Sequence, residues 1–281
     1  MILVTGATGS VGRETVQLLQ AEGAEVAAVT RDPAAASLPA GAHVTSGDPS
    51  RPHTLASALG SIDAVLVSPR AVGGATAELL SLAARHGAQH AVVLSAATVQ
   101  YPAGLPRFAA EFEAVEDAAK ASGLAITLLR SADYAANALA WAPQIRQAGV
   151  VYGAYADAAT SPIHPRDIAA VAVQALTGTR HEGRAYVLTG PQSLTQPEKV
   201  RLIGEATGLD LSFAEAAPEQ VRQAMLTKGL PEEIPDRLLG SLADYARHPG
   251  PTTDTARQLL GRPALTFAEW GAENAAAFTS R

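Results

Sequence analysis

A glycine-rich turn near the N-terminus carries residue types that bind phosphate. The segment Thr5–Gly12 reads TGATGSVG and directly follows the apolar run Ile2–Thr5. Glycines allow a tight turn, and a helix that opens after them directs backbone N–H groups toward an anion. The spacing therefore predicts a binding site for the pyrophosphate of a dinucleotide. The predicted contacts are Gly6, Thr8, Gly9, Ser10, Val11 and Gly12.

The end of the second apolar run indicates which dinucleotide fits. An Asp or Glu at this position would hold the adenosine ribose 2′-hydroxyl of NAD. The chain instead has Thr30 followed by Arg31, whose guanidinium can form a forked contact with a 2′-phosphate. Asp32 could serve the ribose hydroxyls, but next to Pro33 we expect it to start a turn. The segment therefore predicts NADP(H) in preference to NAD(H).

Three polar residues are candidates for a catalytic role. Ser95 ends one apolar run, and Tyr134 and Asn137 follow the next run, three residues apart and hence on one face if that segment is helical. Open α/β sheets bind ligands at the carboxyl ends of their strands, where these side chains would lie. Each also has a structural interpretation, in which Ser95 bonds to local backbone and the other two pack in the core or lie at the surface.

The end of the fourth apolar run, Ser68-Pro69-Arg70, adds two candidate cofactor contacts, Ser68 and Arg70. Arg70 could equally meet an acidic substrate or remain solvated. His164 precedes Pro165 and could titrate near neutral pH in a pocket, although packing at a helix entry is the favoured interpretation.

No metal site is expected. The chain has no Cys, which excludes disulfides and Cys-ligated metals. His86 and His90 are four residues apart, but Gly87 between them breaks a common helix face.

Short apolar runs alternate with longer segments of helical periodicity in the first half of the chain. The runs are Ile2–Thr5, Glu25–Thr30, Ala42–Thr45, Ala64–Val67, Ala91–Ser95 and Ala125–Leu129. The helical segments are Val11–Glu22, Ala75–His86 and Phe108–Ser122. This alternation predicts an α/β fold, a Rossmann-type doubly wound parallel sheet with helices on both faces.

After Arg130 the composition shifts toward turns and helices. The predicted elements are a helix over Arg166–Thr177, a strand over Arg184–Leu188, a helix over Gln196–Thr207 capped by Ser193 or Thr195, and a mostly helical stretch over Pro218–Phe278. We expect a dinucleotide-binding domain over residues 1–130. Residues 131–281 are expected to form a small, mostly helical C-terminal lobe that binds substrate over the carboxyl edge of the sheet.

The net charge and the apolar stretches of the chain indicate which classes of binding partner to expect. The 281 residues carry a formal net charge of -6 and no basic run, which argues against nucleic-acid binding. The N-terminus has no positively charged leader and no apolar stretch of the roughly 20 residues that a membrane span needs. We therefore expect a cytoplasmic protein whose partner is a small molecule.

Several motifs together resemble the NmrA-like atypical short-chain dehydrogenase/reductases. They are TGATGSVG at the start, TRDP at 30–33, SGDPS at 46–50, LLRSADYAAN at 128–137, IHPRDIA at 163–169, YVLTGP at 186–191 and LTFAEW at 265–270. The resemblance spans nearly the whole chain. It implies an NAD(P)-binding Rossmann domain with a small substrate lobe, and it adds Asp48 to the cofactor contacts. This family contains quinone reductases, other small reductases and redox-sensing regulators.

The resemblance also shows what is missing. Typical short-chain reductases use a Tyr and a Lys four residues later to pass a proton to the carbonyl oxygen. The residues four positions before Lys120, Lys199 and Lys228 are Glu116, Thr195 and Ala224. Any proton must therefore come from elsewhere.

A site without this pair suits a substrate that accepts hydride readily. We expect an NADPH-dependent reductase of a quinone or conjugated carbonyl compound, with an aromatic or quinone-like substrate. Two alternatives stay open from the sequence. One is a non-catalytic NADP(H)-sensing regulatory protein, and the other is an isomerase or dehydratase of a natural-product intermediate.

Overall fold

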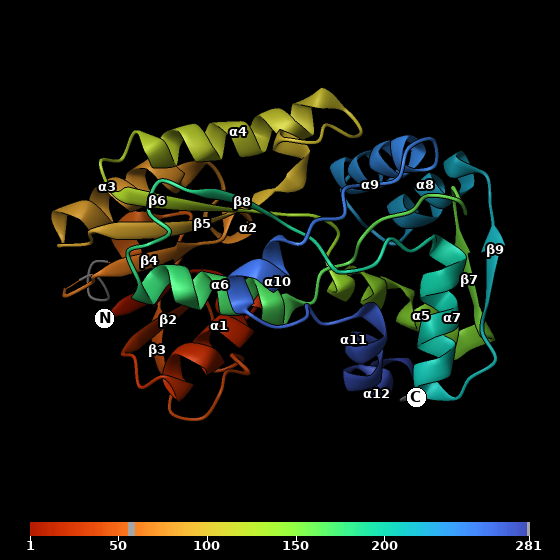
Figure 1. Cartoon of the computed structure of the whole chain (residues 1–281), viewed down its shortest axis with the longest axis horizontal. Coiled ribbons are helices and arrows are strands. Elements are labelled where there is room, and N and C mark those ends of the chain that lie inside the picture. Colours follow the sequence, from red (N-terminus) through yellow and green to blue (C-terminus); the bar gives the residue numbers. More distant parts are fainter. Residues whose placement is uncertain (56–59, 280–281) are drawn as a thin grey trace. The chain divides into compact units, whose positions relative to one another are not determined.

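Backbone proximity divides the chain into two compact units (Figure 1). The structure, a computed structural model, describes residues 1–55 and 60–279. The first unit comprises Met1–Val99, Ala110–Ser131 and Pro165–Val187. The second comprises Gln100–Ala109, Ala132–His164 and the chain from Leu188 onward. The first unit thus includes residues 165–187, which the sequence-based partition assigned to the C-terminal lobe.

A seven-stranded sheet forms the centre of the first unit, in the order β3-β2-β1-β4-β5-β6-β8. Its strands are β1 (Ile2–Val4), β2 (Val26–Thr30), β3 (His43–Ser46), β4 (Ala64–Val67), β5 (His90–Ala96), β6 (Ala125–Ser131) and β8 (Ala185–Leu188). The pairings among β1 to β6 are parallel. The strand order reverses between β1 and β4, which is the switch point of a doubly wound sheet. The predicted Rossmann-type fold is confirmed.

The central strands form because their side chains are buried on both faces of the sheet. Every residue of β1 and β4 is buried, as expected for short runs of Val, Leu, Ile and Ala in a parallel sheet. On one face, Val65 and Val93 belong to an apolar cluster that also contains Leu79 and Leu80 from a helix. This packing fixes the carboxyl ends of the strands at one edge.

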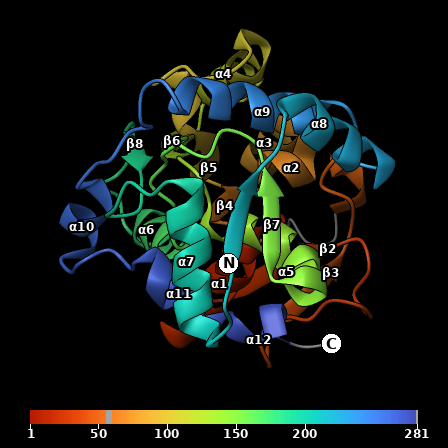
Figure 2. The ribbon, with the colours of Figure 1, turned by 90° about the vertical axis from the view of Figure 1, so that its right-hand side faces the viewer.

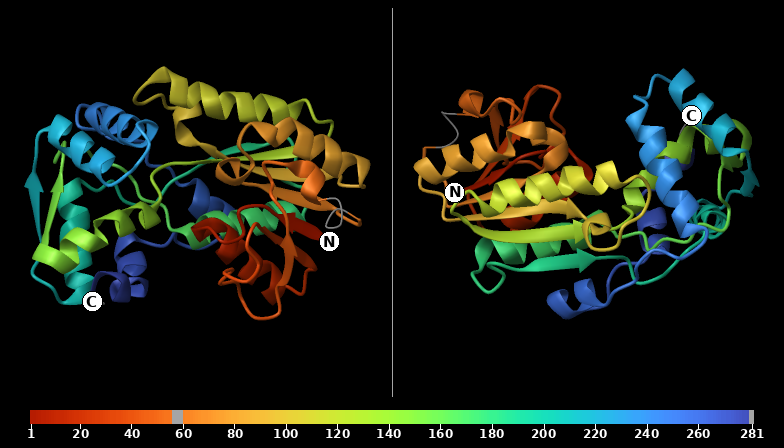
Figure 3. Two further views of the ribbon diagram at one scale, coloured as in Figure 1. Left: turned by 180° about the vertical axis from the view of Figure 1, so that it is seen from behind. Right: turned by 90° about the horizontal axis from the view of Figure 1, so that it is seen from above.

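Helices cover both faces of this sheet. The helical segments that lie wholly or mainly in the first unit are α1 (Ser10–Ala21), η1 (Pro52–Leu55), α2 (Pro69–Val72), η2 (Gly73–Ala75), α3 (Thr76–Arg85), η3 (Ala97–Val99), α4 (Pro106–Lys120) and α6 (Pro165–Thr177). Figure 1 and the reverse view in Figure 3 show α3 and α4 on one side of the sheet and α1 and α6 packed together on the other.

The second unit pairs two short parallel strands, β7 (Val150–Gly153) and β9 (Ser212–Glu215). Figure 2 shows them side by side, with α7 next to β9 and α5 next to β7. Its helical segments are η4 (Ala135–Trp141), α5 (Ala142–Ala148), α7 (Gln196–Thr207), α8 (Pro218–Thr227), α9 (Glu233–Tyr245), α10 (Thr255–Leu260), α11 (Phe267–Glu273) and α12 (Ala275–Thr279). The lobe is mostly helical, as predicted, but neither strand was predicted from the sequence.

Local signals explain how the second unit is held together. Thr195 caps α7 through a capping box with Glu198, so the cap is Thr195 and not Ser193. Phe267, Trp270 and Phe278 are buried. Phe267 stacks on Trp270 with ring centroids 5.2 Å apart, and Phe278 meets Trp270 edge to face at 6.1 Å. No helix in residues 1–55 and 60–279 is long and apolar enough to cross a bilayer.

Candidate functional site

The predicted phosphate loop follows β1 and bends sharply at Gly6. Gly6 has a φ of +64°, and its carbonyl oxygen accepts a hydrogen bond from the N–H of Gly9 (3.0 Å). A Cβ atom on Gly12 would lie 2.1 Å from that same carbonyl oxygen. Any side chain at position 12 would therefore push the loop apart, so the loop requires glycine there.

The start of α1 is open for an anion. Gly9 is the N-cap residue, no side chain caps the helix, and its first turn contains no acidic residue. Thr8, Gly9 and Ser10 are exposed. The first N–H groups of this helix and its dipole are thus left for a negatively charged ligand. This cradle fits the pyrophosphate that the sequence pattern predicts.

Thr5 ties the phosphate loop to the neighbouring strand at the switch point. Its hydroxyl donates to the carbonyl oxygen of Leu66 (2.8 Å) and accepts from the N–H of Ser68 (2.8 Å). A Cβ atom on Gly6 would lie 2.8 Å from the Cβ atom of Ser68. Two predicted cofactor contacts, Gly6 and Ser68, therefore lie side by side at the carboxyl ends of β1 and β4.

In the turn after β2, the side chain of Asp32 bonds to the turn itself, and the side chain of Arg31 is exposed. Oδ1 of Asp32 accepts hydrogen bonds from the N–H groups of Ala34 and Ala35 (both 3.1 Å), so Asp32 starts the turn as predicted. Arg31 is exposed, and within the described chain its guanidinium makes no hydrogen bond or ion pair. Arg31 is therefore available for a phosphate next to the strand that flanks β1.

The carboxylate of Asp48 accepts hydrogen bonds from neighbouring residues, whereas the structure shows no such contact for the Arg70 side chain in the described residues. Asp48 follows β3, and hydrogen bonds from Ser50 to its carboxylate hold its pKa below the usual value. Arg51 also donates to Asp48 (3.2 Å), so this carboxylate shapes its own loop. Arg70, in α2, is exposed and has no side-chain partner among the residues that the structure describes.

Ser95 lies in a buried polar cluster. Its hydroxyl donates to Oε1 of Glu116 (2.7 Å), and Arg130 donates to both carboxylate oxygens of Glu116 (2.8 Å and 2.7 Å). Burial alone would raise the pKa of Glu116, but the hydrogen bonds from Arg130 and Ser95 outweigh it and hold the pKa below its usual value. Glu116 therefore stays ionised. The Ser95 proton is directed at this carboxylate, 21 residues away, and not at local backbone as the structural interpretation of Ser95 expected.

Tyr134 and Asn137 lie in the second unit at the start of η4. Tyr134 is half-buried and extended, and it forms an isolated bridge with Ile163, so the helical turn begins only after it. Asn137 is exposed, and its Nδ2 donates to Oδ1 of Asp133 (2.9 Å). The condition for placing both side chains on one helical face is therefore not met.

A lysine that sequence analysis left without a role completes a second polar cluster. Lys199 in α7 is buried, and its Nζ lies 2.9 Å from Oδ2 of Asp133. Thr160 donates to the same carboxylate oxygen (2.7 Å). Burial raises the pKa of Asp133, but the charge of Lys199 and the hydrogen bonds from Lys199, Thr160 and Asn137 together outweigh burial, so the pKa lies below its usual value. The cluster fixes the segment that carries Asn137.

Two buried histidines, His164 and His90, lie in packed surroundings. His164 is buried just before α6, and its Nε2 lies 3.3 Å from Oε2 of Glu273. His90 is buried at the start of β5, with Nε2 3.3 Å from the hydroxyl of Thr127. In the described part of the chain, no group of three or more His, Asp and Glu side chains could hold a metal ion.

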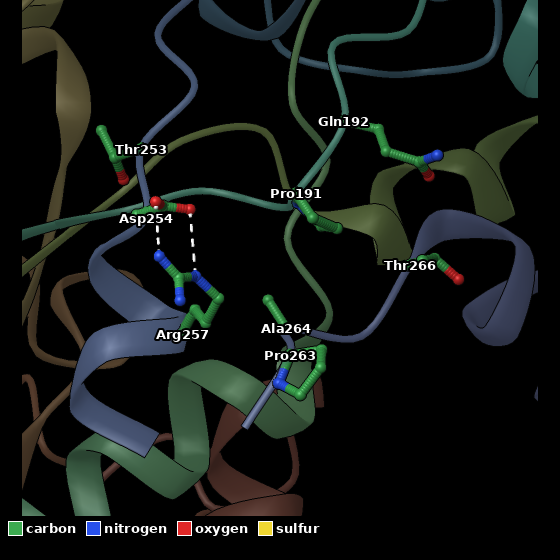
Figure 4. Close-up of a pocket in the computed structure, with 8 residues that line it drawn as sticks. All are labelled: Pro191, Gln192, Thr253, Asp254, Arg257, Pro263, Ala264 and Thr266. Carbon is green, nitrogen blue, oxygen red and sulfur yellow. Dashed lines mark hydrogen bonds and ion pairs between the residues drawn. The ribbon is translucent and has the colours of Figure 1, made fainter. Parts of the chain in front are cut away.

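Figure 4 shows a cavity of about 250 Å³ inside the second unit. Gln192, Thr253 and Thr266 contribute polar side chains to its lining. Its charged residues satisfy each other, because Arg257 donates to both oxygens of Asp254 (3.3 Å and 2.7 Å). The charges in the cavity wall are thus neutralised within it, and Pro191, Pro263 and Ala264 make the remainder of the wall largely apolar.

Comparison with known proteins gives a consistent result. A family model described as NAD(P)H-binding matches residues 6–179, from the phosphate loop to just past the end of α6. The (4-alkanoyl-5-oxo-2,5-dihydrofuran-3-yl)methyl phosphate reductase of Streptomyces griseus is 37% identical over 280 residues, 99% of each chain. The NAD(P)H azoreductase of Xenophilus azovorans is 37% identical over 289 residues, again 99% of each chain.

Solved structures agree with these relatives. The NADPH-dependent quinone oxidoreductase of Escherichia coli superposes with a TM-score of 0.81 at 27% identity, covering 97% of this chain and 99% of that chain. Its complex with NADPH has a TM-score of 0.78 at 26% identity, with the same coverage.

Proposed function

We propose that this chain, which belongs to the NAD(P)H-binding family, is an NADPH-dependent reductase of a quinone or a similarly conjugated carbonyl compound. The family match confirms the resemblance to the NmrA-like atypical short-chain reductases. The observation that carries the proposal is the phosphate cradle, in which Gly6 and Gly12 leave no room for side chains and α1 begins uncapped.

The preference for NADPH rests on Arg31. Asp32 is the residue that would favour NAD, but its Oδ1 atom already accepts hydrogen bonds from the N–H groups of Ala34 and Ala35. Arg31 beside it is exposed and, within the described residues, unpaired. A guanidinium in this state is suited to hold the 2′-phosphate.

The substrate class is supported by the names of the relatives. They act on an oxo-dihydrofuran phosphate that carries an alkanoyl group, on azo compounds and on quinones. These groups share a conjugated, electron-poor system, which accepts hydride without prior protonation. That chemistry suits a chain in which the Tyr–Lys pair is absent.

The chain's own residues would bind the cofactor and orient the substrate. The N–H groups of Ser10, Val11 and Gly12 would hold the pyrophosphate, and Arg31 the 2′-phosphate. The bound cofactor supplies a hydride from its reduced nicotinamide. Tyr134 and Asn137 remain our candidates for contacts with the oxygen on which charge develops. The lowered pKa of Glu116 makes this carboxylate a poor proton donor. In our proposal the product collects its proton from water.

Anaerobic NADPH oxidation with a panel of quinones, azo dyes and α,β-unsaturated ketones tests this function. We expect turnover with at least one class and slower turnover with NADH. Gly12→Ala should abolish NADPH binding because of the clash with the Gly6 carbonyl, whereas Gly74→Ala, where a Cβ meets nothing within 4 Å, should bind normally.

Tight NADPH binding without oxidation by any compound in the panel would contradict the reductase. That result would favour the sensor, or an isomerase or dehydratase that uses the nucleotide structurally. A cytoplasmic location is part of the proposal.

A further inference from the structure

Ser131 ends strand β6 with a buried hydroxyl that has no hydrogen-bond partner. Only 4% of the residue is exposed. Among the residues that the structure describes, no atom pairs with its Oγ. Buried polar side-chain atoms of folded proteins nearly always have a partner. An unpaired hydroxyl at the ligand-binding edge of a sheet therefore indicates a partner that comes from outside the chain.

The strand order places Ser131 toward the nicotinamide half of a bound dinucleotide. In the order β3-β2-β1-β4-β5-β6-β8, Arg31 follows β2 on one side of the phosphate loop, and Ser131 ends β6 on the other side. A pyrophosphate at the switch point between β1 and β4 lies between the two halves of the dinucleotide. With the 2′-phosphate at Arg31, the nicotinamide half extends along the carboxyl ends of β4, β5 and β6.

The side chain of Ser131 also points to the appropriate face of the sheet. Side chains alternate between the two faces along a strand, and Arg130, the preceding residue, pairs with Glu116 of α4. Ser131 therefore points to the opposite face, which α1 and α6 cover (Figure 1, Figure 3). The helix start that forms the phosphate cradle belongs to this same face. All of these residues lie in the first unit.

The polar side chains that end β5 and β6 differ in their hydrogen bonding. Ser95 and Arg130 both donate to the carboxylate of Glu116. Ser131 has no such partner in the described chain. Ala96 is paired with Ser131 across the two strands, so its methyl group shares the same face, and this residue is partly exposed. The strand ends beside Ser131 are therefore open to a ligand.

We propose that the hydroxyl of Ser131 binds the carboxamide group of the nicotinamide ring. A carboxamide offers a carbonyl acceptor and two N–H donors, and a hydroxyl can both donate and accept. The pairing gives each group a partner when the ring leaves water. It also sets the rotation of the ring about its bond to the ribose, and hence the ring face that is presented for hydride transfer. The inference rests on the dinucleotide binding of the proposed function and not on turnover.

Calorimetric titration with two nucleotides tests this contact. NADPH carries the nicotinamide, whereas 2′-phospho-ADP-ribose has the same phosphates and both riboses but no nicotinamide. Ser131→Ala should weaken NADPH binding about fivefold, the ratio that one neutral hydrogen bond supports, and leave 2′-phospho-ADP-ribose binding unchanged. Thr45→Val is the matched control. Thr45 in β3 also has a buried hydroxyl without a partner in the described residues, so its loss should change neither affinity.

Thermal unfolding separates a cofactor contact from a structural role. Ser131→Ala loses no hydrogen bond within the described chain, so the midpoint without nucleotide should not fall. A fixed concentration of NADPH should then raise the midpoint less in Ser131→Ala than in the unmodified protein, because the variant binds NADPH more weakly. A midpoint that falls without nucleotide, with an unchanged rise on addition of NADPH, would assign the hydroxyl to structure and overturn the inference.

The two nucleotides also separate failure of this inference from failure of the proposed function. Equal weakening of both nucleotides by Ser131→Ala would overturn the carboxamide contact. Unchanged NADPH binding in this variant would overturn it as well and would leave water as the partner of the hydroxyl. If the unmodified protein binds neither nucleotide, the proposed cofactor fails together with the contact. A selective loss of NADPH affinity in a protein that reduces no quinone, azo dye or unsaturated ketone would keep the contact and reject the reductase.

Discussion

The carboxylate of Glu116 accepts hydrogen bonds from both Nε and Nη2 of Arg130, and it does so while only 1% of the Glu116 side chain is exposed. Glu116 occupies the position four residues before Lys120, where a short-chain reductase would have its tyrosine. Because the pair joins α4 to β6, it stabilises the edge of the sheet on which Ser95 lies.

Breaking this pair should destabilise the protein strongly. Glu116→Gln removes the charge to which both Nε and Nη2 of Arg130 donate, and removing one partner of a buried pair costs about 3–5 kcal/mol. Since Arg130 retains 17% exposure of its side chain, we expect the lower end of this range. Urea unfolding measures the change. Glu78→Gln, at an exposed position of α3, should alter stability far less. Equal effects of the two variants would contradict a stabilising role for the pair.

Arg31→Ala should weaken NADPH binding while NADH binding stays nearly unchanged. The lost contact is one charge-assisted interaction with the 2′-phosphate, a group that NADH lacks, so about tenfold in the dissociation constant for NADPH is expected. Turnover at saturating NADPH should change much less. Calorimetry with both nucleotides decides the matter, and Arg85→Ala, at the far end of α3, serves as the control. Equal affinity for NADPH and NADH in the unmodified protein would remove the specificity argument.

The sheet was predictable because burial on both faces leaves a continuous apolar signal. Ile2–Val4 and Ala64–Val67 carry it plainly, and both form strands. β7 and β9 were missed because each is short and partly exposed, with Tyr152 and Ser212 in solvent. Their pairing follows from tertiary contacts with α5 and α7, which no local pattern encodes.

In the candidate site, too, the features set by neighbouring residues were predictable and the contacts between distant residues were not. The glycines and Asp32 are local features, since a turn or a helix start depends on a few neighbouring residues. The partner of Ser95 is 21 residues away, and that of Lys199 is 66 residues away. Such contacts exist only after the chain has folded. The sequence offered two signals for these clusters, the small number of lysines and the charge of Glu116 on an otherwise partly apolar helix, α4. Neither signal identifies the partner of the residue.

Tyr134→Phe and Asn137→Ala should lower turnover and leave NADPH affinity nearly unchanged. If either side chain donates to the oxygen on which charge develops, its loss should cost about 2.7–4 kcal/mol, or 10²–10³ in kcat. Nδ2 of Asn137 also contacts Asp133, so Asn137→Asp separates the two roles by repelling that carboxylate. Steady-state kinetics and thermal unfolding are measured together. A fall in stability with unchanged kcat would assign both residues to structure alone.

Two buried histidines should make stability depend on pH. Burial lowers the pKa of His90 from its usual 6.5, and burial with the nearby charge of Arg180 lowers that of His181. Both rings are therefore neutral in the folded protein, where His181 contacts the hydroxyl of Tyr186 (3.0 Å) and Thr127 links the two. A lowered folded-state pKa means that the unfolded chain binds more protons below pH 6.5.

The stabilisation by these neutral rings is complete above pH 6.5 and is lost as the pH falls below that value toward the lowered pKa values. Thermal unfolding measured between pH 5 and 8 should show a midpoint that drops on the acidic side. His90→Gln should flatten this dependence, because glutamine keeps a polar contact with Thr127 and does not titrate. His86→Gln, at an exposed position, should leave the slope as it is. An unchanged slope in His90→Gln would assign the acid sensitivity to groups other than this histidine pair.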